Sequence, residues 1–273
     1  MDKRFENITI GTEKLSVIFT TGEIMSRSDA NVQVLQKPAD AKRGFVPSDE
    51  KNFSPSALET LRTAAKHISY LINEGYDIKS ASTFVGNHFS LSERQRLALV
   101  RSISTTGQLD KRRAKEVASL SGREVWIDGF NTVITLEVML CNSILFDCMD
   151  GCIRDLAAMR GTYRIIPETE YAIKMLFSAL AKMNVNSAYI LLDEPVSNSG
   201  RLKALLADIK EEQDKFCPFS LDIQLLKDVD RELWTKENVI TADAIILDHC
   251  ISWFNLMAVC AKESGAKPLR AWA

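Results

Sequence analysis

The sequence lacks long apolar runs, an apolar leader and paired cysteine motifs. No apolar run approaches the roughly 18 to 20 residues that a membrane-spanning helix needs, and the stretch MDKRFENITIGTEK has no apolar segment like that of a signal peptide. The six cysteines form no pair of CxxC motifs, so zinc knuckles are not expected. We therefore expect a cytoplasmic protein whose cysteines are buried free thiols.

Two further absences narrow the chemistry. No GxxxxGK[ST] motif occurs, which argues against P-loop nucleotide hydrolysis. The three histidines, His67, His88 and His249, are isolated in the sequence and predict no Ser-His-Asp triad. The net charge of −2 gives no overall sign of nucleic-acid binding. What remains is an ordinary globular composition, long enough for one large or two modest domains.

The first half of the chain divides into a β segment, a linker and a helical module. Residues 1–36 are rich in β-branched residues and predict a hairpin or a small sheet. Residues 37–52 contain Pro, Gly and charge without a period, which is typical of a linker. Residues 44–120 then predict mostly helix. One helix starts at Ser54 and Pro55, and another starts at a capping box formed by Ser90 and Glu93.

Residues 122–273 alternate between strand-like and helical patterns. VWID, YILLD and NVITAD are strand-like runs separated by helical segments. The segment SILFDCMDGCIRDLA predicts one or two strands with a turn at Asp150 and Gly151. Strands that alternate with helices indicate βαβ units, so we expect a layered α/β domain with a parallel sheet.

Three of the strand-like runs reach an acid at their ends. They are Asp128 after VWI, Asp193 after YILL and Asp243 after NVITA. If the strands are parallel and adjacent, these carboxylates gather at the edge where ligands of open α/β sheets bind. Clustered carboxylates repel, and a divalent cation relieves that repulsion; oxygen ligands favour Mg²⁺ or Mn²⁺. Asn131 and Asp248 lie near enough in sequence to join this site.

The same acids have a purely structural interpretation. An Asp between a strand and a helix often caps the helix, and Asp128 followed by Gly129 also suits a tight turn. For one Asp alone, capping is the simpler explanation. Three such acids in one α/β domain leave a shared metal site and three separate caps equally open.

Other segments suggest phosphate contacts. Eight basic against four acidic residues lie between Phe89 and Val125, which could mark an RNA-facing module or an ordinary solvated surface. In the segment DEPVSNSGRL, Ser197 and Ser199 could hold a phosphate at a helix N-terminus or simply form a capping loop. Arg154 could contact phosphate, although surface ion pairs are the commoner use of such residues.

The chain resembles a prokaryotic family called domain of unknown function 434. The resemblance is carried by YLINEGYDIKSA, FVGNHF and LSERQRLALVR, and continues through WIDGFNTVITLE, DGCIRDLA, LLDEPVSNSGRL and ITADAIILD. It covers roughly residues 43–260. It implies no activity, because the family name states none.

A second resemblance is weaker but carries chemistry. VWIDGFN and ITADAIILD are similar to two strands of PIN-like and NYN-type nuclease domains, which are metal-dependent ribonucleases with a parallel sheet between helices. This resemblance implies that Asp128 binds metal, Asn131 orients the metal or phosphate, and Asp243 completes the site. Asp193 and Asp248 match less closely. The segment after Asp243 departs from the pattern, because it lacks the closely spaced acidic pair of NYN domains.

Together these patterns predict a metal-dependent ribonuclease with a PIN/NYN-like α/β domain. Asp128, Asp193 and Asp243 would be the catalytic residues and would hold Mg²⁺ or Mn²⁺ with Asp248, while Asn131, Ser197, Ser199 and Arg154 would contact the substrate. One alternative is a non-catalytic module that binds RNA or nucleotides. Another is a small-molecule phosphoesterase that uses the VSNSG loop. RNA is the expected partner, no membrane is expected, and a homo-oligomer is left open.

Overall fold

The computed structural model describes residues 6–10, 13–17, 42–157 and 161–272. The chain forms two compact units, Met1–Ala41 and Lys42–Ala273. In the first unit, strands β1 (Glu6–Ile10) and β2 (Glu13–Val17) pair antiparallel. The hairpin or small sheet predicted for residues 1–36 is therefore confirmed for these two strands, whereas residues 18–36 lie outside the described residues.

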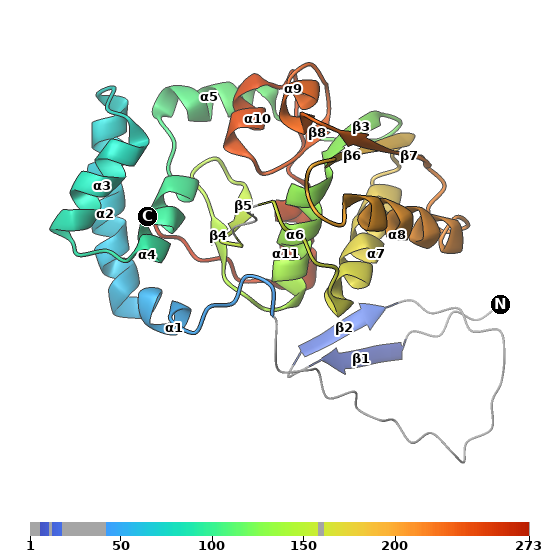
Figure 1. Cartoon of the computed structure of the whole chain (residues 1–273), viewed down its shortest axis with the longest axis horizontal. Coiled ribbons are helices and arrows are strands. Elements are labelled where there is room, and N and C mark those ends of the chain that lie inside the picture. Colours follow the sequence, from blue (N-terminus) through green and yellow to red (C-terminus); the bar gives the residue numbers. More distant parts are fainter. Residues whose placement is uncertain (1–5, 11–12, 18–41, 158–160, 273) are drawn as a thin grey trace, which may run out of the picture. The chain divides into compact units, whose positions relative to one another are not determined.

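The second unit begins with five helices (Figure 1). They are α1 (Asp49–Asn52), α2 (Pro55–Asn73), α3 (Ile78–His88), α4 (Glu93–Ser102) and α5 (Thr106–Lys115). As predicted, Ser54 caps α2 and Pro55 occupies its first position. The helices enclose a core that also takes in Phe146 and Leu156 from a later hairpin. The helical region therefore depends on the rest of the unit for part of its core.

Two sequence predictions in this region are wrong in position. The capping box of α4 is formed by Ser92 and Gln95, not by Ser90 and Glu93. Ser90 has a left-handed φ of 52° and lies in the turn before the helix. The predicted linker also ends in a helix, because residues 49–52 form α1. Both Ser90 with Glu93 and Ser92 with Gln95 match the capping-box pattern, and the sequence alone does not show which pair caps the helix.

A four-stranded parallel sheet forms the centre of the α/β region. Its strands are β3 (Glu124–Asp128), β6 (Ser187–Asp193), β7 (Ser220–Leu226) and β8 (Val239–Ile240), in the order β7-β6-β3-β8. The expected parallel sheet is confirmed. Strands β4 (Leu145–Asp147) and β5 (Ile153–Asp155) form a separate antiparallel hairpin, with the turn at Asp150 and Gly151 that the sequence predicted.

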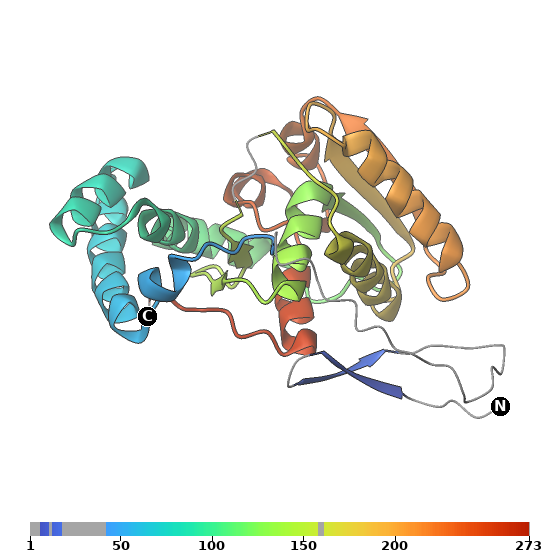
Figure 2. The same cartoon turned by 60° about the horizontal axis from the view of Figure 1, so that its bottom comes forward.

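Helices cover both faces of this sheet. Val125 and Ile127 of β3 face a core shared with α6 (Gly129–Leu140), α7 (Pro167–Lys182), α8 (Ser199–Glu212) and α11 (Leu256–Ser264). Leu191 and Val239 face the other side, where α9 (Val229–Leu233) and α10 (Ala244–His249) pack. Figure 2 shows α7 (yellow) and α8 (orange) in front of the sheet. After β8 the chain continues as two helices, α10 and α11, which pack on opposite faces of the sheet.

The strand order reverses between β3 and β8. From β3 the chain adds β6 and then β7 on one side, and β8 then pairs with β3 on the other side. In open parallel sheets, a crevice lies outside the carboxyl ends of the strands at such a reversal, and ligands bind there. The carboxyl ends of β3 and β8 therefore mark the first place to look for a site.

Two expectations about the whole chain can be compared with the structure. All six cysteines are buried free thiols, as predicted. Within the described ranges, no helix combines the length and apolar character needed to cross a membrane.

Candidate functional site

Asp128 lies at the carboxyl end of β3 and is only 7% exposed. Its Oδ1 accepts a hydrogen bond from the Asn131 backbone N–H at 3.4 Å, and its Oδ2 accepts one from the Thr241 hydroxyl at 2.8 Å. The carboxylate thus caps α6, as the structural interpretation predicts, but it also reaches across to the chain beyond β8. Its neighbour Gly129 packs directly on β6, since a Cβ there would lie 2.8 Å from the Leu191 carbonyl oxygen.

The segment Thr241–Asp243 forms the other wall of the reversal point. The Asn131 Oδ1 accepts a hydrogen bond from the Ala242 N–H at 2.8 Å, and the Asp243 N–H donates to the Thr241 hydroxyl at 3.0 Å. The Asp243 carboxylate accepts hydrogen bonds from two backbone N–H groups at the start of α10. Asn131 therefore joins the start of α6 to the chain beyond β8. Its amide nitrogen has no hydrogen-bond acceptor among the described residues.

Electrostatic interactions link Asp128 and Asp243 to further acids. Burial raises the pKa of Asp128 to about 7, and the carboxylates of Asp243 and Asp193 add to that increase. Asp193, at the end of β6, has a pKa raised by burial and then by Asp228. Asp230 on α9 has a pKa raised by burial and then by Asp243, Asp193 and Asp228. We call these five residues the acidic cluster.

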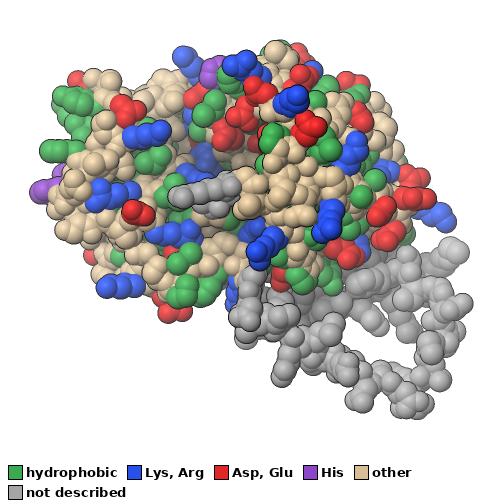
Figure 3. Space-filling view, in the orientation of Figure 1, with side chains coloured by type: hydrophobic (Ala, Val, Ile, Leu, Met, Phe, Trp, Pro, Cys, Tyr) green, Lys and Arg blue, Asp and Glu red, His purple; other side chains and the backbone are tan. Residues whose placement is uncertain are grey.

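The acidic cluster has little compensating positive charge. In the described part of the chain, Asp128, Asp193, Asp230 and Asp243 form no ion pair, and Asp228 pairs only with the exposed Arg231 on its own helix. Figure 3 shows acidic side chains gathered beside α9 and α10. The cluster is not a ready-made metal cage, because within the described ranges no three His, Cys, Asp or Glu side chains are arranged to hold a metal ion.

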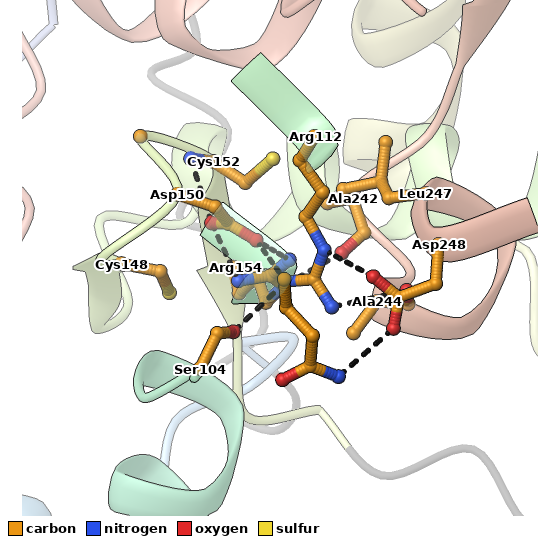
Figure 4. Close-up of polar contacts among 12 residues, drawn as sticks. Ser104, Arg112, Cys148, Asp150, Cys152, Arg154, Ala242, Ala244, Leu247 and Asp248 are labelled. Carbon is orange, nitrogen blue, oxygen red and sulfur yellow. Dashed lines mark hydrogen bonds and ion pairs between the residues drawn. The ribbon is translucent and has the colours of Figure 1, made fainter. Parts of the chain in front are cut away.

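Asp248 belongs to a different group of charges. Its Oδ1 accepts from Arg112 Nε on α5 at 2.7 Å, and Arg112 Nη1 also contacts Asp150 at 2.6 Å. Arg154 Nη2 contacts the same Asp150 oxygen at 2.6 Å. Figure 4 shows both guanidinium groups turned toward Asp150. We call Arg112, Asp150, Arg154 and Asp248 the buried ion network; all but Asp248 are almost completely buried.

The buried ion network also binds the backbone on either side of Asp243 in the acidic cluster. Arg154 Nε donates to the Ala242 carbonyl oxygen at 2.6 Å, and Arg112 Nη2 donates to the Ala244 carbonyl oxygen at 3.2 Å. The peptide units around Asp243 are therefore held on one side by Asn131 and on the other by two arginines. Arg154 was predicted to contact substrate; its guanidinium is instead occupied by these protein partners.

The VSNSG loop uses its polar groups to hold the neighbouring chain. Ser197 Oγ accepts a hydrogen bond from the Tyr163 N–H at 3.0 Å, and Asn198 Nδ2 donates to the Tyr163 carbonyl oxygen at 2.6 Å. Ser199 is 7% exposed and donates to the Glu194 carbonyl oxygen. The hydroxyl groups of both serines proposed as phosphate ligands are thus already hydrogen-bonded to backbone groups of the protein.

The basic side chains between Phe89 and Val125 also bind mainly to other groups of the protein. Six of its eight basic side chains bind carboxylates, carbonyl oxygens or side-chain amides within the protein: Arg94, Arg96, Arg101, Arg112, Lys115 and Arg123. Lys111 and Arg113 on α5 are exposed. Most of the positive charge that suggested an RNA-facing module therefore stabilises the fold.

Sequence reasoning missed three residues of the site. Asp228 and Asp230 follow β7 in the segment KDVDREL, so the strand-end rule that selected Asp128 would have found them. Thr241, whose hydroxyl contacts Asp128, had no signal in the sequence, because only the pairing of β8 with β3 brings it there.

Comparisons with known proteins identify families but no activity. A family model described as "Domain of unknown function (DUF5616)" matches residues 117–259, and one described as "Protein of unknown function (DUF434)" matches residues 60–115. An uncharacterized protein of Methanocaldococcus jannaschii is 34% identical over 192 residues, which cover 69% of this chain and 89% of the relative. No solved structure matches the chain significantly.

These matches refine the resemblances drawn from the sequence. The resemblance to DUF434 is confirmed for the helical region only, because the α/β region matches a separate family model. Its assignment over residues 43–260 was therefore too long. The similarity to PIN-like and NYN-type nucleases has no counterpart among these matches.

Proposed function

We propose that this chain, which belongs to the DUF5616 family, is a metal-dependent ribonuclease. The acidic cluster would bind Mg²⁺ or Mn²⁺, and the protein would hydrolyse RNA phosphodiester bonds. The α/β region would be a PIN/NYN-like domain. The reversal of strand order between β3 and β8, with acids at the ends of β3 and β6 and just beyond β8, supports this assignment.

One observation carries the proposal. Asp128 is a buried carboxylate that has other carboxylates as neighbours and no ion-pair partner in the described part of the chain. Burying an uncompensated charge is costly, and each nearby carboxylate adds to that cost. Helix capping accounts for the positions of Asp128 and Asp243, but it does not offset the repulsion between their carboxylates. A cation that binds between them removes the repulsion.

The donor set fits a hydrated hard cation better than a structural metal. All candidate ligands are carboxylate or hydroxyl oxygens, which suit Mg²⁺ and Mn²⁺. Mg²⁺ is usually held by one or two carboxylates together with water and substrate phosphates. The lack of a three-residue cage among the described residues is compatible with such binding, whereas a structural zinc site requires four protein ligands.

The residues around the site would divide the work. A divalent cation bound there would stabilise charge on a phosphate and lower the pKa of water. Asp128, buried beside Asp243 and Asp193, would act as general base and accept a proton from the attacking water. Asp243 and Asp193 would bind the cation. Thr241 and Asn131 would orient Asp128 and the segment Thr241–Asp243 through the hydrogen bonds described above.

A non-catalytic binding module is the second candidate. It is favoured by the same lack of a preformed cage, and by the hydrogen bonds that already satisfy Asp128 and Asp243 as helix caps. In that case the protein would bind RNA or a nucleotide at the reversal point without cleaving it. The phosphoesterase alternative loses its support, because Ser197 is hydrogen-bonded to the backbone of Tyr163 and Ser199 to that of Glu194.

Cleavage of labelled single-stranded RNA of mixed sequence tests the proposal. We expect cleavage that requires added Mn²⁺ or Mg²⁺ and stops with EDTA. Asp128→Asn should reduce the rate at least about 100-fold, because it removes the proposed general base. Asp222→Asn is the matched control, since Asp222 is an exposed carboxylate on β7 of the same sheet.

Two results would separate the candidates. Cleavage that survives in Asp128→Asn, or that needs no divalent cation, contradicts the proposed nuclease. RNA binding by the parent protein without any cleavage, under cation conditions that saturate the protein, supports the binding module instead.

A further inference from the structure

A stacked pair of rings lies beside the acidic cluster. Trp234 follows α9 directly, and its indole stacks on the imidazole of His249 with centroids 4.4 Å apart and an angle of 22° between the planes. His249 is the last residue of α10 and is exposed. One face of its ring therefore packs on Trp234, while the side chain remains accessible to solvent.

The His249 ring is also fixed in orientation. Its Nδ1 lies 2.8 Å from the Ile245 carbonyl oxygen, one turn earlier on α10. Ile245 itself is 55% exposed on the same side of the helix, four residues from His249. The stack and the hydrogen bond together hold the ring in one orientation, beside an exposed apolar side chain. We call Trp234, His249 and Ile245 the ring platform.

The ring platform is tied closely to the acidic cluster. Asp243 caps α10, and His249 ends that helix six residues later, about 9 Å along the axis. Asp230 lies on α9, four residues before Trp234. Each ring is thus joined by less than two helical turns to a carboxylate of the cluster. The platform and these two carboxylates are therefore carried by the same two short helices.

We propose that the ring platform binds a nucleobase of single-stranded RNA by stacking on His249. This inference rests on the proposed function for its biological role, but base binding can be tested apart from cleavage. Stacking on an aromatic ring accepts every base, because each has a π face, so the platform would bind with little sequence preference. It supplies the aromatic surface that the sequence of the basic helical region lacks.

Nearby cations are placed to contact the phosphate chain. Helix α5 packs against α10 and carries the exposed Lys111 and Arg113, and α9 carries the exposed Arg231. Arg113 and Arg231 make only exposed pairs with acids on their own helices. Such pairs exchange readily for a phosphate, because surface ion pairs are weak. Figure 3 shows basic and histidine side chains close to the acidic group on this face.

Binding of a fluorescein-labelled single-stranded oligoadenylate tests the platform. The protein is kept in EDTA, so that cleavage cannot occur, and fluorescence anisotropy gives the Kd. His249→Ala should weaken binding about 5- to 100-fold, the effect of losing one stacked base. His249→Phe should retain most of the affinity, because it keeps an aromatic face. His88→Ala is the control, since His88 is an exposed histidine on the distant helix α3.

A second oligonucleotide makes the test specific to base stacking. An otherwise identical strand with abasic sites should bind the parent more weakly, and His249→Ala should bind both strands with similar affinity. Equal affinity of the parent and His249→Ala for the oligoadenylate would overturn the proposal. It would also be overturned if the abasic strand bound the parent as well as the oligoadenylate does, or if the parent bound neither strand.

These outcomes are independent of the proposed nuclease. If the cleavage assay fails while base-dependent binding is lost in His249→Ala, the ring platform stands and the binding-module candidate gains support. If cleavage succeeds but His249→Ala changes neither binding nor cleavage, the nuclease stands and the platform is wrong. A surface that served a protein partner through Ile245 would give this second pattern.

Discussion

Two groups of charged side chains meet at the segment Thr241–Asp243, and they differ in how their charge is balanced. In the buried ion network, Arg112 and Arg154 both contact Asp150, and Arg112 also contacts Asp248. In the acidic cluster, Asp128 has only hydroxyl and N–H partners. The first arrangement is explained by folding, since its charges satisfy each other. In the second, helix capping explains the positions of Asp128 and Asp243 but leaves their charges unbalanced, and the proposed cation would balance them.

Removing the shared carboxylate of the buried ion network should have the largest effect. Although burial raises the pKa of Asp150, Arg154 and Arg112 lower it by more, so the residue stays ionised. Asp150→Ala would leave two buried guanidinium groups close together without the carboxylate that both of them bind. We expect the free energy of unfolding, measured by urea denaturation, to fall by about 3 to 5 kcal/mol.

The matched control is another arginine–aspartate pair. Asp110 contacts Arg113 on α5 at 3.8 Å, and both side chains are mostly exposed. Asp110→Ala should change the free energy of unfolding by less than about 0.5 kcal/mol, since an exposed pair contributes little. Similar losses in both variants would show that burial does not distinguish the two pairs.

The acidic cluster should make the free energy of unfolding depend on pH. The pKa of Asp128 is about 7 in the folded protein, against about 3.9 in an unfolded chain. Between these values the folded state binds more protons than the unfolded state, so the free energy of unfolding decreases as pH rises. The decrease attributable to Asp128 is at most about 4 kcal/mol and is complete above pH 7.

Asp128→Asn isolates this contribution. The variant cannot ionise at this position, so its stability should decline less than that of the parent between about pH 4 and 7. Urea denaturation at several pH values, without divalent cations, measures both slopes. Equal slopes in the parent and the variant would mean that Asp128 titrates normally and that the acidic cluster carries no electrostatic penalty.

A smaller effect should come from the packing beneath Asp128. Gly129→Ala would place a methyl group 2.8 Å from the Leu191 carbonyl oxygen and 2.6 Å from a Leu192 methyl. We expect a loss of about 1 to 3 kcal/mol in the free energy of unfolding, because the backbone of β6 must shift. Gly107→Ala on α5 meets nothing within 4 Å and should be neutral or slightly stabilising.

The sequence predicted the architecture better than the site. Alternation of patterns indicated the parallel sheet, and acids at strand ends led to Asp128, Asp193 and Asp243, which the structure places at the same end of the sheet. Those signals are local. The order β7-β6-β3-β8 is not, and only this order explains why Thr241 contacts Asp128.

The errors have the same origin. Asp248 was predicted as a fourth metal ligand, but it lies near the end of α10 and its carboxylate binds Arg112 of α5. Arg154 looked like a surface cation, but the β4–β5 hairpin places it in the core beside Asp150. Asp248 and Arg112 are 136 residues apart in the sequence, so no spacing rule could pair them. Asp150 and Arg154 are only four residues apart, but the sequence does not show that the hairpin buries them together.

Calorimetric titration of Mn²⁺ into the metal-free protein at pH 7.5 or above tests the central claim most directly. Asp128→Asn and Asp222→Asn would be titrated in parallel, the second as the exposed-carboxylate control. Binding by the parent and by Asp222→Asn, weakened at least about 10-fold in Asp128→Asn, is the result expected if the cluster holds a cation. No binding by the parent, or equal binding by Asp128→Asn, would contradict the account and leave Asp128 as a helix cap.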